Sequence, residues 1–142
     1  MPFVIDASVA MKWYLAEIYQ TEAILVLDSD EILFAPDLLL SEVGNIIWKK
    51  VRLKELSNKE GLALITSFSR VSERVQIIPS SSLLEPAFEI ATAYDRTVYD
   101  AMYMSLAVAH SCRLLTADRR LFNSLVQTRL AGNLRWIGDV SL

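Results

Sequence analysis

Phe3-Val4-Ile5-Asp6-Ala7-Ser8 begins with a short apolar run, which ends at an aspartate and passes into a helical pattern. Apolar runs without polar alternation are typical of strands that are buried on both faces of a parallel sheet. Further short apolar runs follow along the chain, and helical segments separate them. The expected strands are residues 3–5, 32–35, 75–78, 114–115 and 134–137.

The segments between these strands show helical periodicity and helix-boundary residues. The expected helices are residues 8–15, 22–27, 38–51, 58–70, 82–94, 100–110 and 118–126. Ser57 and Glu60 form a capping-box pattern, and Asp37 stands where the N-cap of the next helix is expected. Strands that alternate with helices predict an α/β fold, in which helices cover both faces of a parallel sheet.

The composition predicts one domain with a large apolar core. The chain has 142 residues, and its apolar fraction of 53% lies above the range of about 45–50% for soluble domains. The excess apolar surface indicates a homodimer or a tight protein partner. A parallel sheet that is covered on both faces would account for the same composition, so both explanations remain open.

Membrane and secreted classes are disfavoured. No apolar run reaches the roughly 18 residues that a membrane span needs. The N-terminal segment lacks the basic region and the cleavage site of a signal peptide. The single cysteine, Cys112, allows neither an intrachain disulfide nor a zinc site, and we expect it to be buried. These features predict a cytoplasmic protein without a membrane partner.

The charge balance bears on nucleic-acid binding. A net charge of −3 argues against a protein that binds nucleic acid mainly through an overall positive charge. A nuclease is not excluded, because a bound metal ion would cancel several acidic charges. Local basic clusters also remain, and they consist of Lys49, Lys50, Arg52 and Lys54 and of Arg119 and Arg120.

Four acidic residues stand out in this apolar chain, and three of them lie at strand ends or helix starts. Asp6 and Asp118 follow expected strands, Asp100 begins an expected helix, and Glu42 lies within another helix. Taken singly, the three aspartates are typical helix caps, and Glu42 is compatible with a solvated helix face. Ligands of open α/β sheets bind beyond the carboxyl ends of the strands, where Asp6 and Asp118 are expected.

The acids taken together indicate metal chemistry. Carboxylates that converge on one edge of a sheet repel one another, and a divalent cation removes that penalty. Oxygen ligands without a His or Cys partner suit Mg²⁺ or Mn²⁺. The pattern therefore predicts a small metal-dependent hydrolase of phosphate esters. His110 is expected about 15 Å from Asp100 along its helix, too far to act as the base.

In order and spacing, four stretches of the chain resemble the motifs of PIN domains, most closely those of VapC-type toxin ribonucleases from toxin–antitoxin pairs. The stretches are Val4-Ile5-Asp6-Ala7-Ser8, Pro36-Asp37-Leu38-Leu39-Leu40-Ser41-Glu42-Val43-Gly44-Asn45, Val98-Tyr99-Asp100-Ala101-Met102-Tyr103 and Leu114-Leu115-Thr116-Ala117-Asp118-Arg119-Arg120-Leu121. The resemblance implies a three-layer α/β/α sandwich with a central parallel sheet of four to five strands, in a single domain over residues 1–142. It also implies Mg²⁺- or Mn²⁺-dependent endoribonuclease activity, a homodimer, and a small antitoxin that lies over the active-site groove.

The resemblance assigns roles to particular residues. It places the catalytic and metal-binding quartet on Asp6, Glu42, Asp100 and Asp118, and supporting roles on Ser8, Thr116 and Asn45.

The remaining candidates come from residue chemistry. Arg119, Arg120 and Lys49 are candidate contacts to RNA phosphates, with a solvated helix face as the alternative. Tyr99 and Tyr103 are either base-stacking or core residues.

Three other functions are compatible with parts of the pattern. An aspartyl phosphotransferase would need a second aspartate where Ser8 stands, and a receiver domain would need a lysine at the end of a late strand. A PIN-like module that binds RNA or protein without cleavage is the main alternative. An intact acidic quartet argues against it.

Overall fold

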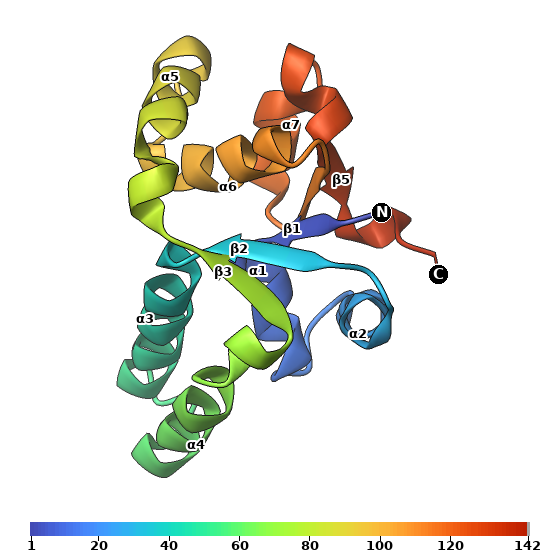
Figure 1. The fold of residues 1–142 in the computed structure, drawn as a ribbon. Coiled ribbons are helices and arrows are strands. Elements are labelled where there is room, and N and C mark those ends of the chain that lie inside the picture. The colour runs from blue at the N-terminus through green and yellow to red at the C-terminus, as the bar shows by residue number, and fades with distance from the viewer. Residues whose placement is uncertain (142) are drawn as a thin grey trace.

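The computed structural model describes residues 1–141 and places a parallel sheet at the centre of the molecule (Figure 1). The sheet has five strands in the order β3-β2-β1-β4-β5, and all neighbouring pairs are parallel. The strands are β1 (Phe3–Ile5), β2 (Leu33–Pro36), β3 (Val75–Ile78), β4 (Arg113–Thr116) and β5 (Leu134–Trp136). The predicted parallel sheet is therefore confirmed.

Helices occupy the connections between the strands. The α-helices are α1 (Ala7–Ala10), α2 (Gln20–Asp28), α3 (Leu38–Arg52), α4 (Asn58–Phe68), α5 (Leu84–Tyr94), α6 (Val98–Ala109) and α7 (Arg119–Leu125). Short 3₁₀ segments are η1 (Met11–Trp13), η2 (Val71–Glu73), η3 (Ser80–Ser82), η4 (Arg129–Asn133) and η5 (Ile137–Asp139). None of the helices in residues 1–141 combines the length and the apolar character needed to cross a bilayer.

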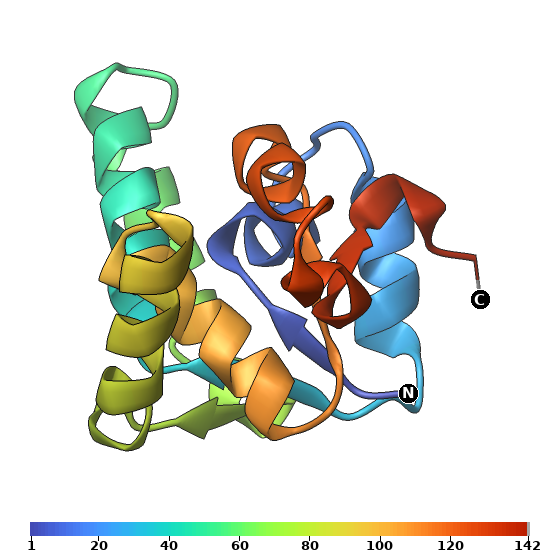
Figure 2. The same ribbon diagram turned by 90° about the horizontal axis from the view of Figure 1, so that it is seen from above.

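The helices form a layer on each side of the sheet. α6 packs across β1, β2 and β4, and its central residues from Ala101 to Ala107 are buried. α1 and α3 lie on the other side, below the sheet in Figure 1. Figure 2 looks down on α6 and shows it beside α5, with α3 behind them. This arrangement confirms the three-layer α/β/α sandwich.

The strand order creates a switch point beside β1. The chain runs from β1 outward to β2 and β3, and then returns to place β4 on the other side of β1. The register pairs Ile5 with Leu115, so both strands end at the same level. Asp6 and Thr116 therefore lie at the edge of the sheet where open α/β folds bind ligands.

Side-chain caps mark the starts of four α-helices, α1, α4, α6 and α7. The Ser57–Glu60 capping box is present as predicted. α6 begins two residues before Asp100, because the Thr97 side chain caps it by accepting from the Asp100 N–H. The prediction for Asp37 was wrong in part: it occupies the N-cap position of α3, but its carboxylate accepts a hydrogen bond from the Ser80 hydroxyl instead.

Candidate active site

An open cavity of about 220 Å³ lies beyond the carboxyl ends of β1 and β4. Its lining contains all four predicted acids, which come from the loop after β1, from α3, from α6 and from the loop before α7. The lining residues are Asp6, Ala7, Ser8, Glu42, Ile46, Asp100, Tyr103, Asp118 and Leu121. Residues that are far apart in the chain therefore share one cavity, as the sequence pattern predicted.

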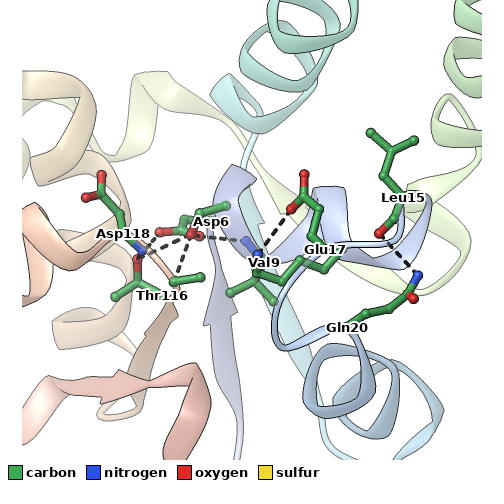
Figure 3. A network of polar contacts seen from close by, with 10 residues as sticks. Asp6, Val9, Leu15, Glu17, Gln20, Thr116 and Asp118 are labelled. Carbon is green, nitrogen blue, oxygen red and sulfur yellow. Dashed lines mark hydrogen bonds and ion pairs between the residues drawn. The ribbon is translucent and has the colours of Figure 1, made fainter. Parts of the chain in front are cut away.

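Asp6, Ser8, Thr116 and Asp118 form what we call the sheet half of the site. Asp6 is buried, and Ser8 and Thr116 each donate a hydroxyl hydrogen bond of 2.5 Å to a different oxygen of its carboxylate. The Val9 N–H adds a third bond of 3.1 Å, so Asp6 also caps α1 (Figure 3). The Asp6 carboxylate therefore caps α1 while these donors hold it in one orientation.

The electrostatics of Asp6 are unfavourable without a cation. The pKa of Asp6 is raised from 3.8 to about 6, chiefly by burial and to a smaller extent by the charge of Asp118, while the three hydrogen bonds oppose the shift. Among residues 1–141, no lysine or arginine forms an ion pair with Asp6. A buried carboxylate beside a second carboxylate is the arrangement that a bound cation relieves.

Thr116 links Asp6 to Asp118 at the end of β4. Its hydroxyl donates to Asp6 and accepts from the Asp118 N–H at 3.0 Å (Figure 3). One oxygen of Asp118 caps α7 by accepting from the N–H groups of Arg120 and Leu121 at 3.0 and 3.2 Å. No donor within the described chain contacts its other oxygen, Oδ2, so capping leaves that atom available at the cavity.

Glu42, Arg96, Asp100 and Tyr103 form the helix half of the site. The Tyr103 hydroxyl donates to Glu42 Oε1, and Arg96 Nη2 donates to Asp100 Oδ2 at 2.8 Å. Burial, together with the nearby charge of Asp100, raises the pKa of Glu42, and the Tyr103 hydrogen bond opposes that shift. The helix half thus contains a second pair of carboxylates, each of which is held by one protein donor.

The other predicted residues lie in different surroundings. Ser8 accepts from the Ala117 N–H at 2.9 Å as well as donating to Asp6, whereas Asn45 is exposed on α3 and does not line the cavity. Lys49 lines a neighbouring cavity of about 220 Å³, and Ile46 is shared by both cavities.

The two predicted arginines are exposed at the start of α7. The Arg119 guanidinium lies 3.6 Å from the centroid of the Trp136 ring, a cation–π contact. Arg120 makes its cavity-side contact through its backbone N–H, which donates to Asp118. Their side chains therefore remain on the surface beside the site.

Two contacts in the helix half are not predicted by the sequence pattern. That pattern places Arg96 in a loop, and for Tyr103 it predicts either a core or a base-stacking role. Arg96 stands four residues before Asp100 and Tyr103 three residues after it, which are the spacings that place side chains on one helix face. That spacing was an available signal for the Arg96–Asp100 pair, but not for the contact between Tyr103 and Glu42.

The donor set fits a hydrated divalent cation. In the part of the chain that the structure describes, no three His, Cys, Asp or Glu side chains lie close enough together to hold an ion as they stand. Of the four acids Asp6 is the one that is buried, whereas Glu42 and Asp100 are partly exposed and Asp118 is exposed. Carboxylates combined with retained waters are what Mg²⁺ accepts.

The chain has clear similarities to known proteins. Residues 3–125 match the family model of the PIN domain. Ribonuclease VapC3 of Pyrobaculum aerophilum is 31% identical over 121 residues, which cover 85% of this chain and 92% of the relative.

Solved structures share the fold. The crystal structure of PAE2754 from Pyrobaculum aerophilum has a TM-score of 0.67 at 22% identity, and the match covers 97% of this chain and 90% of that one. VapC20 of Mycobacterium tuberculosis, described as a sarcin-ricin loop cleaving toxin, has a TM-score of 0.63 at 14% identity, with 87% and 95% covered. At these identities the structural similarity shows the architecture alone.

Proposed function

This chain belongs to the PIN domain family, and from that premise we propose that it is a metal-dependent endoribonuclease, the toxin of a type II toxin–antitoxin pair. One observation carries the proposal: four carboxylates from separate elements line one cavity at the switch point of a parallel sheet. The name of the relative, Ribonuclease VapC3, supports the choice of RNA as substrate.

Asp6, Asp100 and Asp118 would hold one Mg²⁺ or Mn²⁺, directly or through water. Glu42 would complete that shell or hold a second, weaker ion. Such an ion, when bound, lowers the pKa of a coordinated water and neutralises charge on phosphoryl oxygens. The raised pKa of Asp6 supports this assignment, because an adjacent cation stabilises the ionised carboxylate.

The remaining side chains orient the acids and the substrate. Ser8 and Thr116 fix both oxygens of Asp6. His110 is exposed at the far end of α6, where its ring stacks on Phe34 at 4.1 Å, so it supplies no base to the cavity. Lys49 lies beyond Ile46 on α3. It is placed to contact a phosphate of an RNA strand that continues from the cavity along this helix.

Arg119 and Arg120 are proposed to contact RNA phosphates on the α7 side of the cavity. Both side chains are exposed, and Arg119 keeps one face of its guanidinium on Trp136. Asn45, exposed one turn from Glu42 on α3, is proposed to act at the rim of the site.

The decisive experiment measures cleavage of a total RNA pool by 5′-end sequencing, with Mg²⁺, with Mn²⁺ and with EDTA. We expect discrete new ends that require a divalent ion, that disappear on chelation and that return when Mn²⁺ is added back. Retention of RNA on the protein without new ends, under every divalent ion, would instead support the alternative of a non-catalytic PIN-like RNA-binding module.

We also propose that the protein forms a homodimer. Large apolar side chains are more than half exposed on several helices, among them Trp48 on α3, Leu62 on α4 and Phe88 on α5. A dimer interface would remove such exposed apolar side chains from water. Light scattering after size exclusion would give about twice the chain mass, and a monomer at all concentrations would exclude the dimer.

The second proposed partner is a small antitoxin that covers the cavity. This proposal is supported by the resemblance to VapC-type toxins and by the openness of the acidic cavity on the protein surface. A short neighbouring gene whose product co-purifies with this chain and suppresses cleavage is the expected result. With RNA as substrate and an antitoxin as partner, the proposed location is the cytoplasm.

A further inference from the structure

Tyr103 combines a core position with a polar contact in the cavity. Its side chain is 3% exposed and belongs to the main hydrophobic core. Its hydroxyl reaches the cavity and donates to Glu42 Oε1. No other hydrogen-bond partner of this hydroxyl is found within residues 1–141. A buried tyrosine hydroxyl needs a partner, and here that partner is one of the four acids.

We propose that Tyr103 is a positioning residue of the metal site, which fixes one oxygen of Glu42 across the junction of α3 and α6 so that the other oxygen faces the ion. This role rests on the proposed function, because it concerns the same cavity. It differs from the earlier alternatives for this residue, since the ring is buried and unavailable to a base, while the hydroxyl contributes to the site.

Glu42 needs such a donor more than the other acids do. Asp6 is held by Ser8, Thr116 and Val9, and Asp118 is held by the first turn of α7. Glu42 has a longer side chain, and Tyr103 is its one donor in the described chain. Ordering a free glutamate side chain costs up to about 2 kcal/mol, so a donor that orders it beforehand favours ion binding.

The surroundings of the hydroxyl agree with a place between the two halves of the site. Burial raises the pKa of Tyr103 far above its usual value, and the charges of Glu42, Asp6 and Asp100 raise it as well. The hydroxyl therefore lies within the influence of acids from both halves of the site. The core holds the Tyr103 ring in place, so its hydrogen bond to Glu42 Oε1 is made from a fixed position.

The test is Mn²⁺ binding by Tyr103→Phe, measured by calorimetry in the absence of RNA. Removing a partner that orients a metal ligand typically costs 10–100-fold in affinity, so we expect Mn²⁺ to bind about tenfold more weakly. Tyr14→Phe is the matched control, because Tyr14 is half-buried against Phe68 and does not line the cavity. It should bind Mn²⁺ like the wild type.

A double-mutant cycle with Glu42→Gln separates positioning from a general effect on the fold. In the Glu42→Gln background, Tyr103→Phe should change Mn²⁺ affinity by less than about twofold, because the carboxylate that it positions is absent. Glu42→Asp tests the same hydrogen bond by changing its partly exposed acceptor instead of its buried donor. It keeps the charge but shortens the reach to Tyr103, and should also bind Mn²⁺ about tenfold more weakly.

The outcomes distinguish this role from the proposed function. If the wild type binds Mn²⁺ and Tyr103→Phe binds it equally well, with only a lower Tm, then Tyr103 is structural and the positioning role is overturned. Unchanged affinity in Glu42→Asp would have the same meaning. A wild-type protein that binds no Mn²⁺ would overturn the proposed function itself.

Discussion

The two halves of the acidic cavity are built in different ways. In the sheet half, the parallel register of β1 and β4 places Asp6 beside Thr116, and short side chains complete the contacts. In the helix half, Tyr103 and Arg96 of the α6 region reach out to hold Glu42 and Asp100. Backbone pairing fixes the first half, whereas the second half depends on longer side chains, through one contact between α3 and α6 and one local ion pair at the start of α6.

This difference indicates which half of the site is more firmly ordered before an ion binds. Asp6 is buried and held by three donors, so its position varies little, at the cost of an unfavourable buried charge. Glu42 and Asp100 are more exposed and are held by one donor each. The sheet half is therefore the more rigid part of the site, whereas the order of the helix half depends on one contact for each acid.

The largest expected effect tests whether both halves are required. Asp6→Asn and Asp100→Asn should each lower RNA cleavage by roughly 10³-fold or more, because several kcal/mol of charge stabilisation are lost and each 1.4 kcal/mol is tenfold. Circular dichroism should show that both variants keep the fold. Full cleavage by either variant would remove that half from the mechanism.

The second effect concerns stability in EDTA and should separate the halves. Because the pKa of Asp6 is raised from 3.8 to about 6 in the folded protein, the unfolding free energy should fall as pH rises between these values. The full loss, up to about 3 kcal/mol, is present above about pH 6. Asp6→Asn lacks this loss and should be more stable than the wild type at pH 7.

Asp100→Asn is the comparison for that measurement. Asp100 is partly exposed and paired with Arg96, so its removal should not abolish the pH-dependent loss. Urea unfolding from about pH 4 to pH 8 would decide the matter. A wild-type curve that stays flat over this range would show that the Asp6 carboxylate is not destabilised by burial.

The third effect tests how rigid the sheet half is. Thr116→Val keeps the buried shape but removes the hydroxyl that links Asp6 to Asp118. Mn²⁺ affinity should fall by about 10–100-fold, as for other partners that orient metal ligands. Calorimetry would measure it, with Thr92→Val on the exposed side of α5 as the control. Equal affinity would mean that strand register alone positions Asp6.

The smallest effect is expected at Arg96. Its ion pair with Asp100 is partly exposed, with side-chain exposures of 26% and 31%. Pairs of this kind contribute about 0.2–1 kcal/mol and are screened by salt. Arg96→Gln should therefore lower the unfolding free energy by less than about 1 kcal/mol, and the difference should vanish in molar salt. A larger loss that persists in high salt would show that Arg96 is part of a rigid framework.

The same sequence signal predicted the fold and the positions of Asp6 and Asp118 at the edge of the sheet. Strand ends are visible as changes from apolar to polar residues, so the order of residues alone places Ile5-Asp6 and Thr116-Ala117-Asp118 on one edge. The sequence also predicted that Glu42 and Asp100 would belong to the cavity, through the resemblance to PIN domains. The four side chains do line it, and their catalytic role remains a proposal.

The contacts between distant side chains could not be predicted. Tyr103 and Glu42 are 61 positions apart, and a tyrosine among apolar helix residues gives no sign of where its hydroxyl points. The same limit applies to Asp37, whose local position indicated a cap. A hydroxyl 43 positions away, on Ser80, bonds the carboxylate instead. Local patterns identify which groups are polar, but tertiary packing selects their partners.

The place of β1 between β2 and β4 has a consequence for biosynthesis. Among the five strands, the central strand is synthesised first, but its second neighbour, β4, is synthesised fourth. Until residues 113–118 emerge, Asp6 lacks Thr116 and Asp118, and one edge of β1 is unpaired. A chain that lacks residues 113–118, or has not yet exposed them during synthesis, is therefore expected to cut no RNA.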